Sequence, residues 1–213
     1  MPPPTTAPRD HEAALEALGL QLIAGVDEAG RGALAGPVVV AAVILPPTPI
    51  IDGIADSKLL SPARRDTLAD QIRACAIAWA VAVISSDMVD AGNILAATHV
   101  GMRRALLGLA PVPDHALIDG LPVPDLPVPN EALVAGDRHS YSIAAASILA
   151  KTHRDRTMCI LDELYPGYGF AGHKGYGAQT HLEAIARLGL CPAHRKTFAG
   201  CRDDGQRALA FDV

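Results

Sequence analysis

The 213 residues suit one globular domain, because 50% of them are hydrophobic and 19% are charged, a composition that excludes a disordered chain. The longest apolar run, residues 74–84, is too short to cross a bilayer, and residues 1–8 lack the charged and apolar regions of a signal peptide, so we expect no membrane contact. The formal net charge of −5 argues weakly against a nucleic-acid partner.

The sequence of the first half of the chain predicts three helices and three strands. Residues 1–10 are rich in proline and threonine, so we expect this part of an N-terminal segment, residues 1–20, to be disordered. The elements expected next are a short helix over 11–19, strands over 22–27 and 38–45, a helix that starts at Pro62 after the cap Ser61, a strand over 76–84 and a helix over 86–109.

The second half predicts two short strands before a helical region. The expected elements are strands over 115–119 and 132–135, a long helix over 141–164, a loop rich in glycine and aromatic residues over 165–177 and a helix over 180–188. The strands come first as an antiparallel run and later alternate with helices. This order predicts an α/β fold with a mixed sheet and helices on its faces.

Two adjacent carboxylates, Asp27 and Glu28, lie where the first predicted strand stops, and Gly30-Arg31-Gly32 follows at once. Neighbouring side chains on a regular strand point to opposite faces, so both carboxylates can share one site only if the strand ends or kinks there. Glycines permit such a backbone and let a ligand come close to it. A solvated turn would explain Asp-Glu alone, but it gives no reason for the Gly-Arg-Gly.

Other kinds of site are less consistent with the sequence. Gly30-x-Gly32-x-x-Ala35 matches the dinucleotide-binding fingerprint, but that fingerprint must open a helix, and here a β-branched run indicates a second strand. A nucleotide-dependent oxidoreductase is therefore disfavoured. The four cysteines form no Cys-x-x-Cys pair, which indicates reduced thiols in a cytoplasmic protein and not a zinc site or disulfides.

Four carboxylates recur at the ends of predicted elements. Asp27 and Glu28 follow the first strand, Asp119 ends the fourth, and Asp137 precedes the long helix. They converge if the first and fourth strands are neighbours, and crowded like charges need a positive partner. Mg²⁺ or Mn²⁺ suits carboxylate oxygens, and two such ions can promote phosphodiester cleavage. A non-catalytic nucleic-acid-binding module is the alternative, but negative charges facing phosphates would not help it.

Positive charge gathers late in the chain. Residues 138–202 hold nine Lys or Arg and four Asp or Glu, a balance of +5 that leaves −10 for the rest, which suggests an acidic centre beside a basic surface. The candidate phosphate-binding residues are Lys58, Lys151, Lys174 and Arg195. Asp155 is an alternative fourth carboxylate, although a salt bridge to Lys151 one helical turn earlier explains it adequately. Nothing selects a proton donor among His139, His153 and His173.

The stretch over residues 25–45 resembles the opening motif of ribonuclease HII, the type 2 ribonuclease H of bacteria. The likeness spans Gly25 to Phe198 in the family's order, through Asp56-Ser57-Lys58-x-Leu60-Ser61, Asn93-Ile94-Leu95-x-x-Thr98, Ile118-Asp119-Gly120, Gly136-Asp137, Ile143 to Lys151, Arg154-Asp155, Tyr165-Pro166, His173-Lys174-Gly175-Tyr176-Gly177, His181 and His194-Arg195.

This resemblance implies a ribonuclease H-like fold, with a mixed five-stranded sheet flanked by helices over residues 21–165. A helical C-terminal extension, residues 166–213, would complete the substrate site. The implied activity is cleavage of RNA in RNA–DNA hybrids and at single ribonucleotides in duplex DNA, with 5′-phosphate and 3′-hydroxyl products. The resemblance further implies dependence on Mg²⁺ or Mn²⁺, and we expect a cytoplasmic monomer.

The resemblance also implies residue roles. The family's four acidic residues match Asp27, Glu28, Asp119 and Asp137, the first three being the metal ligands. Gly30-Arg31-Gly32 matches the motif that reads the ribose 2′-hydroxyl, and Tyr176 matches the tyrosine that packs on that sugar. The sequence departs from the family at Ala178, where threonine is common, and at Thr152-His153, where a β-branched residue is usual after Lys151.

Overall fold

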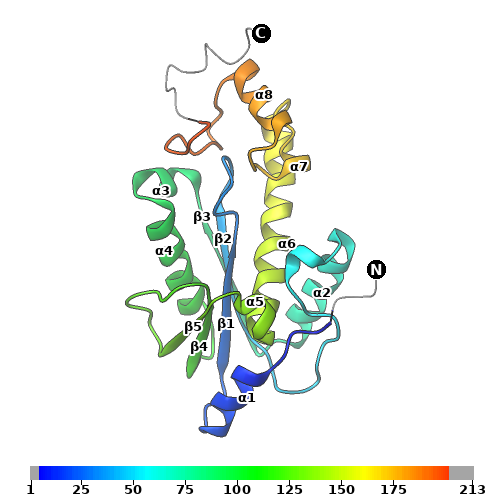
Figure 1. Ribbon diagram of the computed structural model, residues 1–213, viewed down its shortest axis with the longest axis vertical. Coiled ribbons are helices and arrows are strands. Elements are labelled where there is room, and N and C mark those ends of the chain that lie inside the picture. The colour runs from blue at the N-terminus through cyan, green and yellow to red at the C-terminus, as the bar shows by residue number, and fades with distance from the viewer. Residues whose placement is uncertain (1–4, 202–213) are drawn as a thin grey trace.

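The computed structural model describes residues 5–201, which form a five-stranded sheet with helices on both faces (Figure 1). The elements in chain order are α1 Asp10–Ala17, β1 Ile23–Ala29, β2 Val38–Ile44, a 3₁₀ turn Ser57–Leu59, α2 Pro62–Cys75, β3 Ala78–Ile84, α3 Ser86–Ala91, α4 Ile94–Leu107, β4 His115–Asp119, β5 Asn130–Leu133, α5 Gly136–His139, α6 Tyr141–Leu164, α7 Phe170–His173 and α8 Gln179–Leu188.

The sheet has the order β3-β2-β1-β4-β5, with β1, β2 and β3 antiparallel and β1, β4 and β5 parallel. The prediction of a mixed sheet is therefore confirmed, and the first and fourth strands are neighbours, which is the condition under which the carboxylates were expected to converge. The pairing of β1 with β4 ends at Val26 and Ile118, whereas the pairing of β1 with β2 continues to Ala29 and Val39. The last residues of β1 thus have a strand neighbour on one side only.

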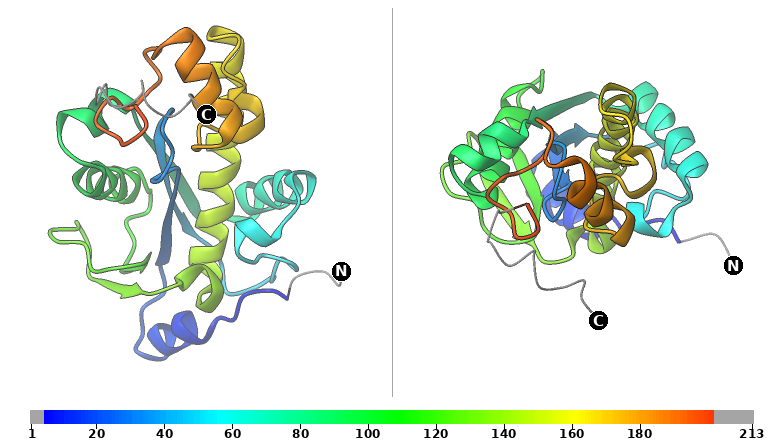
Figure 2. Two further views of the ribbon diagram at one scale, coloured as in Figure 1. Left: turned by 45° about the horizontal axis from the view of Figure 1, so that its top comes forward. Right: turned by 90° about the horizontal axis from the view of Figure 1, so that it is seen from above.

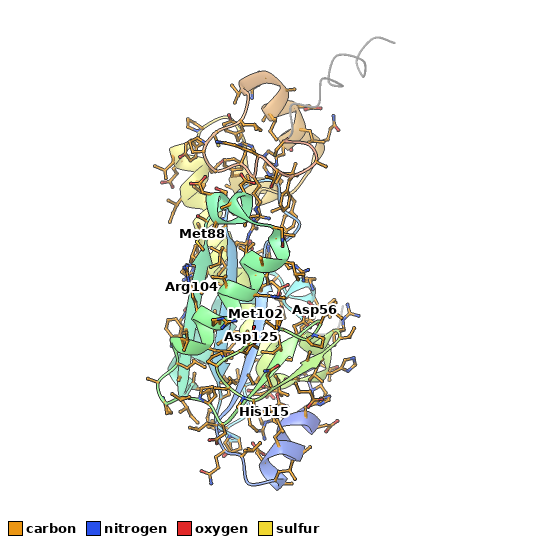
Figure 3. The ribbon with its side chains drawn as sticks, turned by 90° about the vertical axis from the view of Figure 1, so that its left-hand side faces the viewer. Asp56, Met88, Met102, Arg104, His115 and Asp125 are labelled. Atoms are coloured by element: carbon orange, nitrogen blue, oxygen red, sulfur yellow. The ribbon has the colours of Figure 1, made fainter. Side chains whose placement is uncertain are left out.

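Strand β2 is buried on both faces and divides two hydrophobic layers. Alternate residues of a strand point to opposite faces, so Val40 and Ala42 pack toward α4 while Val39 and Ala41 pack toward α2 and α6. Figure 2 shows α4 on one side of the sheet and α6 with α2 on the other. In Figure 3, Met102 lies on α4, and its side chain is part of the first layer.

Helix α6 supports both halves of the molecule. It spans 24 residues, as the sequence predicted, and the Ser140 hydroxyl caps it by accepting from the Ile143 amide at 3.2 Å. Its first half packs so closely on β1 that a side chain at Gly25 would lie 2.0 Å from the Ser142 backbone. Its second half extends beyond the sheet, where α7 and α8 lie against it and Met158 packs beside Phe170 (Figure 1).

The prediction of disorder over residues 1–10 is wrong for residues 5–10. The Ala7 amide donates to the Ile54 carbonyl at 2.8 Å, and Thr6 Oγ1 accepts from the Gly53 amide at 2.8 Å. Glu12 is buried and accepts hydrogen bonds from Ser140 and Ser142 at the start of α6. These long-range contacts hold the segment on the core. Residues 1–4, and the tail 202–213, lie outside the described part of the chain.

Two other predicted elements are placed differently. The predicted helix over 86–109 is two helices, because the chain bends at Gly92 and Asn93 then caps α4 by accepting from the Ala96 amide at 2.9 Å. The strand predicted over 132–135 is β5, Asn130–Leu133, whose register is set by its pairing with β4. The loop predicted over 165–177 contains the short helix α7, and the short helix α5 was not predicted. The boundaries of the other elements agree with the predictions to within two residues.

Candidate active site

The carboxylate cluster, defined as Asp27, Glu28, Asp119 and Asp137, lies where β4 ends beside β1. The prediction that the first strand stops at Asp27 is wrong, since β1 continues to Ala29. By strand alternation Asp27 shares the α6 face with Gly25, and Glu28 shares the α4 face with Val26. Both carboxylates nevertheless face one site, because β4 ends at Asp119 and leaves this edge of β1 open. The negative charge of Asp119 raises the pKa of both side chains.

Negative charge in this cluster is poorly compensated. Burial raises the pKa of Asp27 well above its ordinary value, and repulsion from Glu28 and Asp119 raises it further. Two hydrogen bonds lower this pKa, the larger contribution coming from the Glu28 amide, which donates to Asp27 Oδ1 at 2.6 Å, and the smaller from the Ser147 side chain. Burial also raises the pKa of Glu28, although Arg31 Nη1 lies 3.1 Å from its Oε1 and partly offsets the rise.

A short helix, α5, joins Asp119 to Asp137. The Gly136 amide donates to Asp119 Oδ1 at 2.7 Å, which holds that carboxylate against the start of α5. Asp137 is buried, and burial followed by repulsion from Asp56 raises its pKa. Lys58 Nζ opposes this rise from 3.3 Å away.

Asp56 is a fifth acidic residue near the site, and the sequence analysis gave it no role. It is 2% exposed, lies 3.8 Å from Lys58 and 3.4 Å from Arg138, and accepts from the Lys58 amide at 3.0 Å. Figure 3 labels its position. These contacts hold Lys58 beside Asp137. An aspartate directly before a 3₁₀ turn was the available signal, because such residues accept from the backbone amide two positions on.

The donor atoms suit a hard divalent cation. Glu28 Oε2 is buried and has no hydrogen-bond partner among residues 5–201. Within the same range, no three Asp, Glu, His or Cys side chains form a closed metal-binding group. Mg²⁺ keeps several waters and is usually bound by one or two carboxylates together with substrate phosphates, so an open set of oxygens fits it. The roles of Asp27, Glu28 and Asp119 as metal ligands remain predictions.

Two buried arginines hold the glycine loop, defined as residues 30–37 between β1 and β2. Arg195 donates to the carbonyls of Gly30 at 2.7 Å, Arg31 at 2.8 Å and Gly36 at 2.9 Å. Arg154 donates to the carbonyls of Pro37 at 3.0 Å and Ala35 at 3.2 Å. These hydrogen bonds fix the backbone path of the loop.

The prediction that Arg195 contacts a phosphate is wrong. Its side chain is 0% exposed and is engaged with backbone carbonyls, and burial lowers its pKa to about 10. The sequence analysis also missed Arg154, which is fully buried as well. The sequence signals at Arg154 were a charge inside an alanine-rich helix and its place in a motif of the family resemblance, and neither indicated burial.

The glycines of the loop have different surroundings. Gly30 has a φ of +94°, and a side chain there would lie 2.0 Å from Arg154 Nε, so the fold itself requires glycine. At Gly32 a side chain would meet no described atom within 4 Å. Arg31 is exposed between them, apart from its ion pair with Glu28. Gly32 therefore presents open backbone to whatever approaches the loop.

Tyr176 lies next to the glycine loop. Its ring centroid is 5.2 Å from the Arg154 guanidinium and 6.0 Å from Lys151 Nζ, and the residue is 39% exposed. The Leu34 amide donates to the carbonyl of Gly175 at 2.8 Å. The structure therefore brings Tyr176 and the loop together through Arg154 and one backbone hydrogen bond.

The predicted lysines lie in two places. Lys58 lies beside the carboxylate cluster, 3.3 Å from Asp137. Lys151 and Lys174 line a separate open pocket of about 500 Å³ formed by residues of α2, α6 and α7. Asp155 lines that same pocket, 2.6 Å from Lys151 and 3.5 Å from Arg65. The predicted salt bridge one turn apart is confirmed, and it accounts for Asp155 without a catalytic role.

Comparison with known proteins is consistent with this geometry. The sequence model of the family described as Ribonuclease HII matches residues 24–201. The chain belongs to the ribonuclease HII family. It is 54% identical over 196 residues to Ribonuclease HII 1 of Methylibium petroleiphilum, which covers 92% of this chain and 99% of that protein. It is 50% identical over 193 residues to Ribonuclease HII of Geobacillus kaustophilus, covering 91% and 74% of the two chains.

The fold is also found among solved structures. Ribonuclease H2 of Pyrococcus horikoshii superimposes with a TM-score of 0.70 at 23% identity, over 84% of this chain and 94% of that one. As a member of the ribonuclease HII family, the protein is a ribonuclease H hydrolase that cleaves the RNA strand of RNA–DNA hybrids. No helix within residues 5–201 is long and apolar enough to cross a membrane.

Proposed function

We propose that this ribonuclease HII also cleaves at single ribonucleotides embedded in duplex DNA and leaves 5′-phosphate and 3′-hydroxyl ends. The observation that carries the proposal is the poorly compensated carboxylate cluster at the open edge of β1. Such a cluster is costly to the fold unless it binds cations, and phosphodiester hydrolysis is chemistry that clustered carboxylates and cations perform.

The proposed ligands of Mg²⁺ or Mn²⁺ are Asp27, Glu28 and Asp119, with Asp137 as the fourth catalytic carboxylate. The metal ions, when bound, supply an activated water and stabilise the leaving oxygen. The chain's own contribution is to orient the oxygens: the Glu28 amide holds Asp27, and the Gly136 amide holds Asp119. Lys58, which is exposed beside Asp137, is placed to contact a substrate phosphate at the same edge.

Recognition of the ribose is proposed for Gly30, Arg31, Gly32 and Tyr176. A protein distinguishes RNA from DNA at one position through the 2′-hydroxyl, which both donates and accepts hydrogen bonds. The open backbone at Gly32 permits such contact, and Arg154 and Arg195 keep that backbone in place. Tyr176 would pack on the same sugar, and Lys151 and Lys174 would contact phosphates further along the duplex.

We further propose a cytoplasmic monomer that acts in removing ribonucleotides from DNA. Cys75, Cys159 and Cys191 are free thiols, which is consistent with a reducing compartment. Sedimentation of the purified protein measures the oligomeric state.

The deciding experiment uses a DNA duplex with one ribonucleotide, incubated with the protein in Mg²⁺, in Mn²⁺ and in EDTA. An all-DNA duplex of the same sequence is the control. We expect a cut at the ribonucleotide only when a metal ion is present. Ligation and polymerase extension of the products identify the 5′-phosphate and 3′-hydroxyl ends. An intact ribonucleotide duplex under both metals, while an RNA–DNA hybrid is cut, would restrict the activity to hybrids.

A further inference from the structure

Three histidines lie together behind Tyr176, and the proposed mechanism does not use them. His173 ends α7, His181 lies in α8 and His194 follows it in the chain. The rings of His173 and His181 stack with centroids 4.3 Å apart, and those of His181 and His194 are 5.3 Å apart. His181 is 0% and His194 is 1% exposed, so neither ring can reach a substrate.

The hydrogen bonds of the two buried rings determine their tautomers. Nδ1 of His194 lies 3.0 Å from the Cys191 amide nitrogen and 3.2 Å from both the carbonyl oxygen and Sγ of the same residue. The amide always carries its hydrogen and makes the shortest of these contacts, so we assign Nδ1 as the acceptor and place the hydrogen of neutral His194 on Nε2. Nδ1 of His181 lies 2.8 Å from the Tyr176 carbonyl, which can only accept, so His181 carries its hydrogen on Nδ1. The two Nε2 atoms are 3.1 Å apart, and His194 therefore donates to His181.

A single chain of hydrogen bonds results, from the Cys191 amide through His194 and His181 to the Tyr176 carbonyl. Both rings are neutral in this chain. A proton added to His181 would lie on Nε2 and oppose the Nε2–H of His194 across 3.1 Å, and a proton added to His194 would lie on Nδ1 and oppose the Cys191 amide at 3.0 Å. Burial favours this state by lowering the pKa of both rings, that of His194 to about 4.

His173 fixes the other side of Tyr176. The Gly175 amide donates to Nδ1 of His173 at 3.1 Å, so Nε2 carries the hydrogen and donates to the Tyr168 carbonyl at 2.9 Å. The carbonyl of Gly175 accepts from the glycine loop at Leu34. The backbone on both sides of the Tyr176 side chain is thus held by imidazole rings.

We propose that His181 and His194 are positioning residues, which orient Tyr176 toward the ribose by fixing its carbonyl. The inference rests on the proposed function in one respect, the contact of Tyr176 with the substrate. The hydrogen-bond chain itself does not depend on that function and can be tested without any substrate.

The first test measures the tautomers by long-range proton–nitrogen NMR on protein labelled with ¹⁵N-histidine. We expect His181 to carry its hydrogen on Nδ1 and both His173 and His194 to carry it on Nε2. The variants His181→Asn and His194→Asn assign the signals. A hydrogen on Nε2 of His181 would overturn the inference, whether or not the protein cleaves anything.

The second test separates positioning from a general structural role. His181→Asn keeps an N–H near the place of Nδ1, whereas His181→Leu removes it. We expect His181→Leu to lower the single-turnover rate on a duplex with one ribonucleotide about 10- to 100-fold, since misplacement by about 1 Å costs on the order of 100-fold. The Kd for the same duplex should change by less than about threefold, and His181→Asn should recover most of the rate.

Tyr168→Phe is the matched control, because it removes a 2.9 Å hydrogen bond to Gly189 within the same region but does not touch Tyr176. It should lower Tm and leave the rate unchanged. A normal rate in folded His181→Leu, or an equal loss of rate in Tyr168→Phe, would contradict the proposal. If the wild-type protein does not cut at a lone ribonucleotide, the proposed function fails instead, and the NMR result still decides the hydrogen-bond chain.

Discussion

The carboxylate cluster and the glycine loop are neighbours along β1, and they differ in how far their buried charges are satisfied by hydrogen bonds. In the cluster, negative side chains lie close together, Glu28 Oε2 has no hydrogen-bond partner among the described residues, and burial raises the pKa of Asp27. At the loop, the buried guanidinium of Arg195 donates to three carbonyl oxygens through all of its nitrogens, while Arg154 donates to two carbonyls and leaves Nη1 without a partner among the described residues.

The difference indicates that the carboxylate cluster can bind cations and that the arginines at the glycine loop support its backbone. A buried charge that keeps unused acceptors is destabilising, and binding a cation relieves that cost. A buried charge whose hydrogen bonds are all made to the backbone rigidifies the chain around it. We infer that the cluster performs the chemistry while the loop forms a fixed surface against which the ribose is placed.

The largest effect is expected at the cluster. Asp27→Asn and Asp119→Asn should each lower the cleavage rate by more than about 100-fold, because even residues that only orient metal ligands contribute about 10- to 100-fold. Single-turnover rates on an RNA–DNA hybrid measure this loss, and circular dichroism shows whether the fold persists. A rate near that of the wild type in a folded variant would remove that carboxylate from the proposed ligands.

At the arginines that support the glycine loop, substitution is expected to lower stability. Arg195→Ala should destabilise the protein by at least about 3 kcal/mol, because it leaves buried carbonyls without donors. The expected fall in Tm is about 2–4 °C for each kcal/mol in a chain of this size. Arg187→Ala is the control, since that exposed arginine also donates to a carbonyl, of Gly167 at 3.1 Å, and should cost little. Similar Tm values for the two variants would contradict the supporting role of Arg195.

Within the loop, Gly30 and Gly32 should respond differently. Gly30→Ala forces a side chain into a left-handed backbone against Arg154, which should cost about 1–3 kcal/mol of stability. Gly32→Val meets no described atom in the free protein, so its Tm should stay near that of the wild type while the Kd for a ribonucleotide duplex rises. Normal binding and normal rate in Gly32→Val would exclude this position from the ribose site.

These contrasts show what sequence could and could not predict. The alanine-rich stretch over residues 141–164 predicted α6, and the short apolar run ending in a carboxylate predicted β4 and Asp119. Such features depend on residues close together in the chain. The burial of Arg195 depends on carbonyls more than 150 positions away, at Gly30 and Gly36, and no local pattern records it.

The same reason explains the error at residues 5–10. Proline and threonine there indicate weak local structure, but Ala7 is held by Ile54 and Glu12 is held by the start of α6. The ordering contacts come from distant parts of the chain. At Asp27 and Glu28 the sequence predicted a shared site correctly in principle, but for the wrong reason: β4 ends early, while β1 does not.

The smallest expected effect concerns pH and metal ions together, and it tests the contrast most directly. Burial raises the pKa of Asp27, so the folded state binds its proton more tightly than the unfolded state does. Its contribution to stability is therefore present below the ordinary pKa of an aspartate and is lost as pH rises through the raised value. In EDTA, Asp27→Asn should match the Tm of the wild type at low pH and exceed it by a growing margin toward neutral pH.

Adding Mg²⁺ or Mn²⁺ at neutral pH should reverse that margin. A ligand at 100 times its Kd stabilises the folded state by about 2.7 kcal/mol, which corresponds to several degrees in Tm. The wild type should gain this stability, and Asp27→Asn, which lacks one proposed ligand, should gain little. Arg187→Ala should follow the wild type, because its cluster is intact. If both metal ions leave the Tm of the wild type unchanged, the cluster is a strained part of the fold and not a cation site. The inference that the cluster performs the chemistry beside a fixed glycine loop would then be wrong.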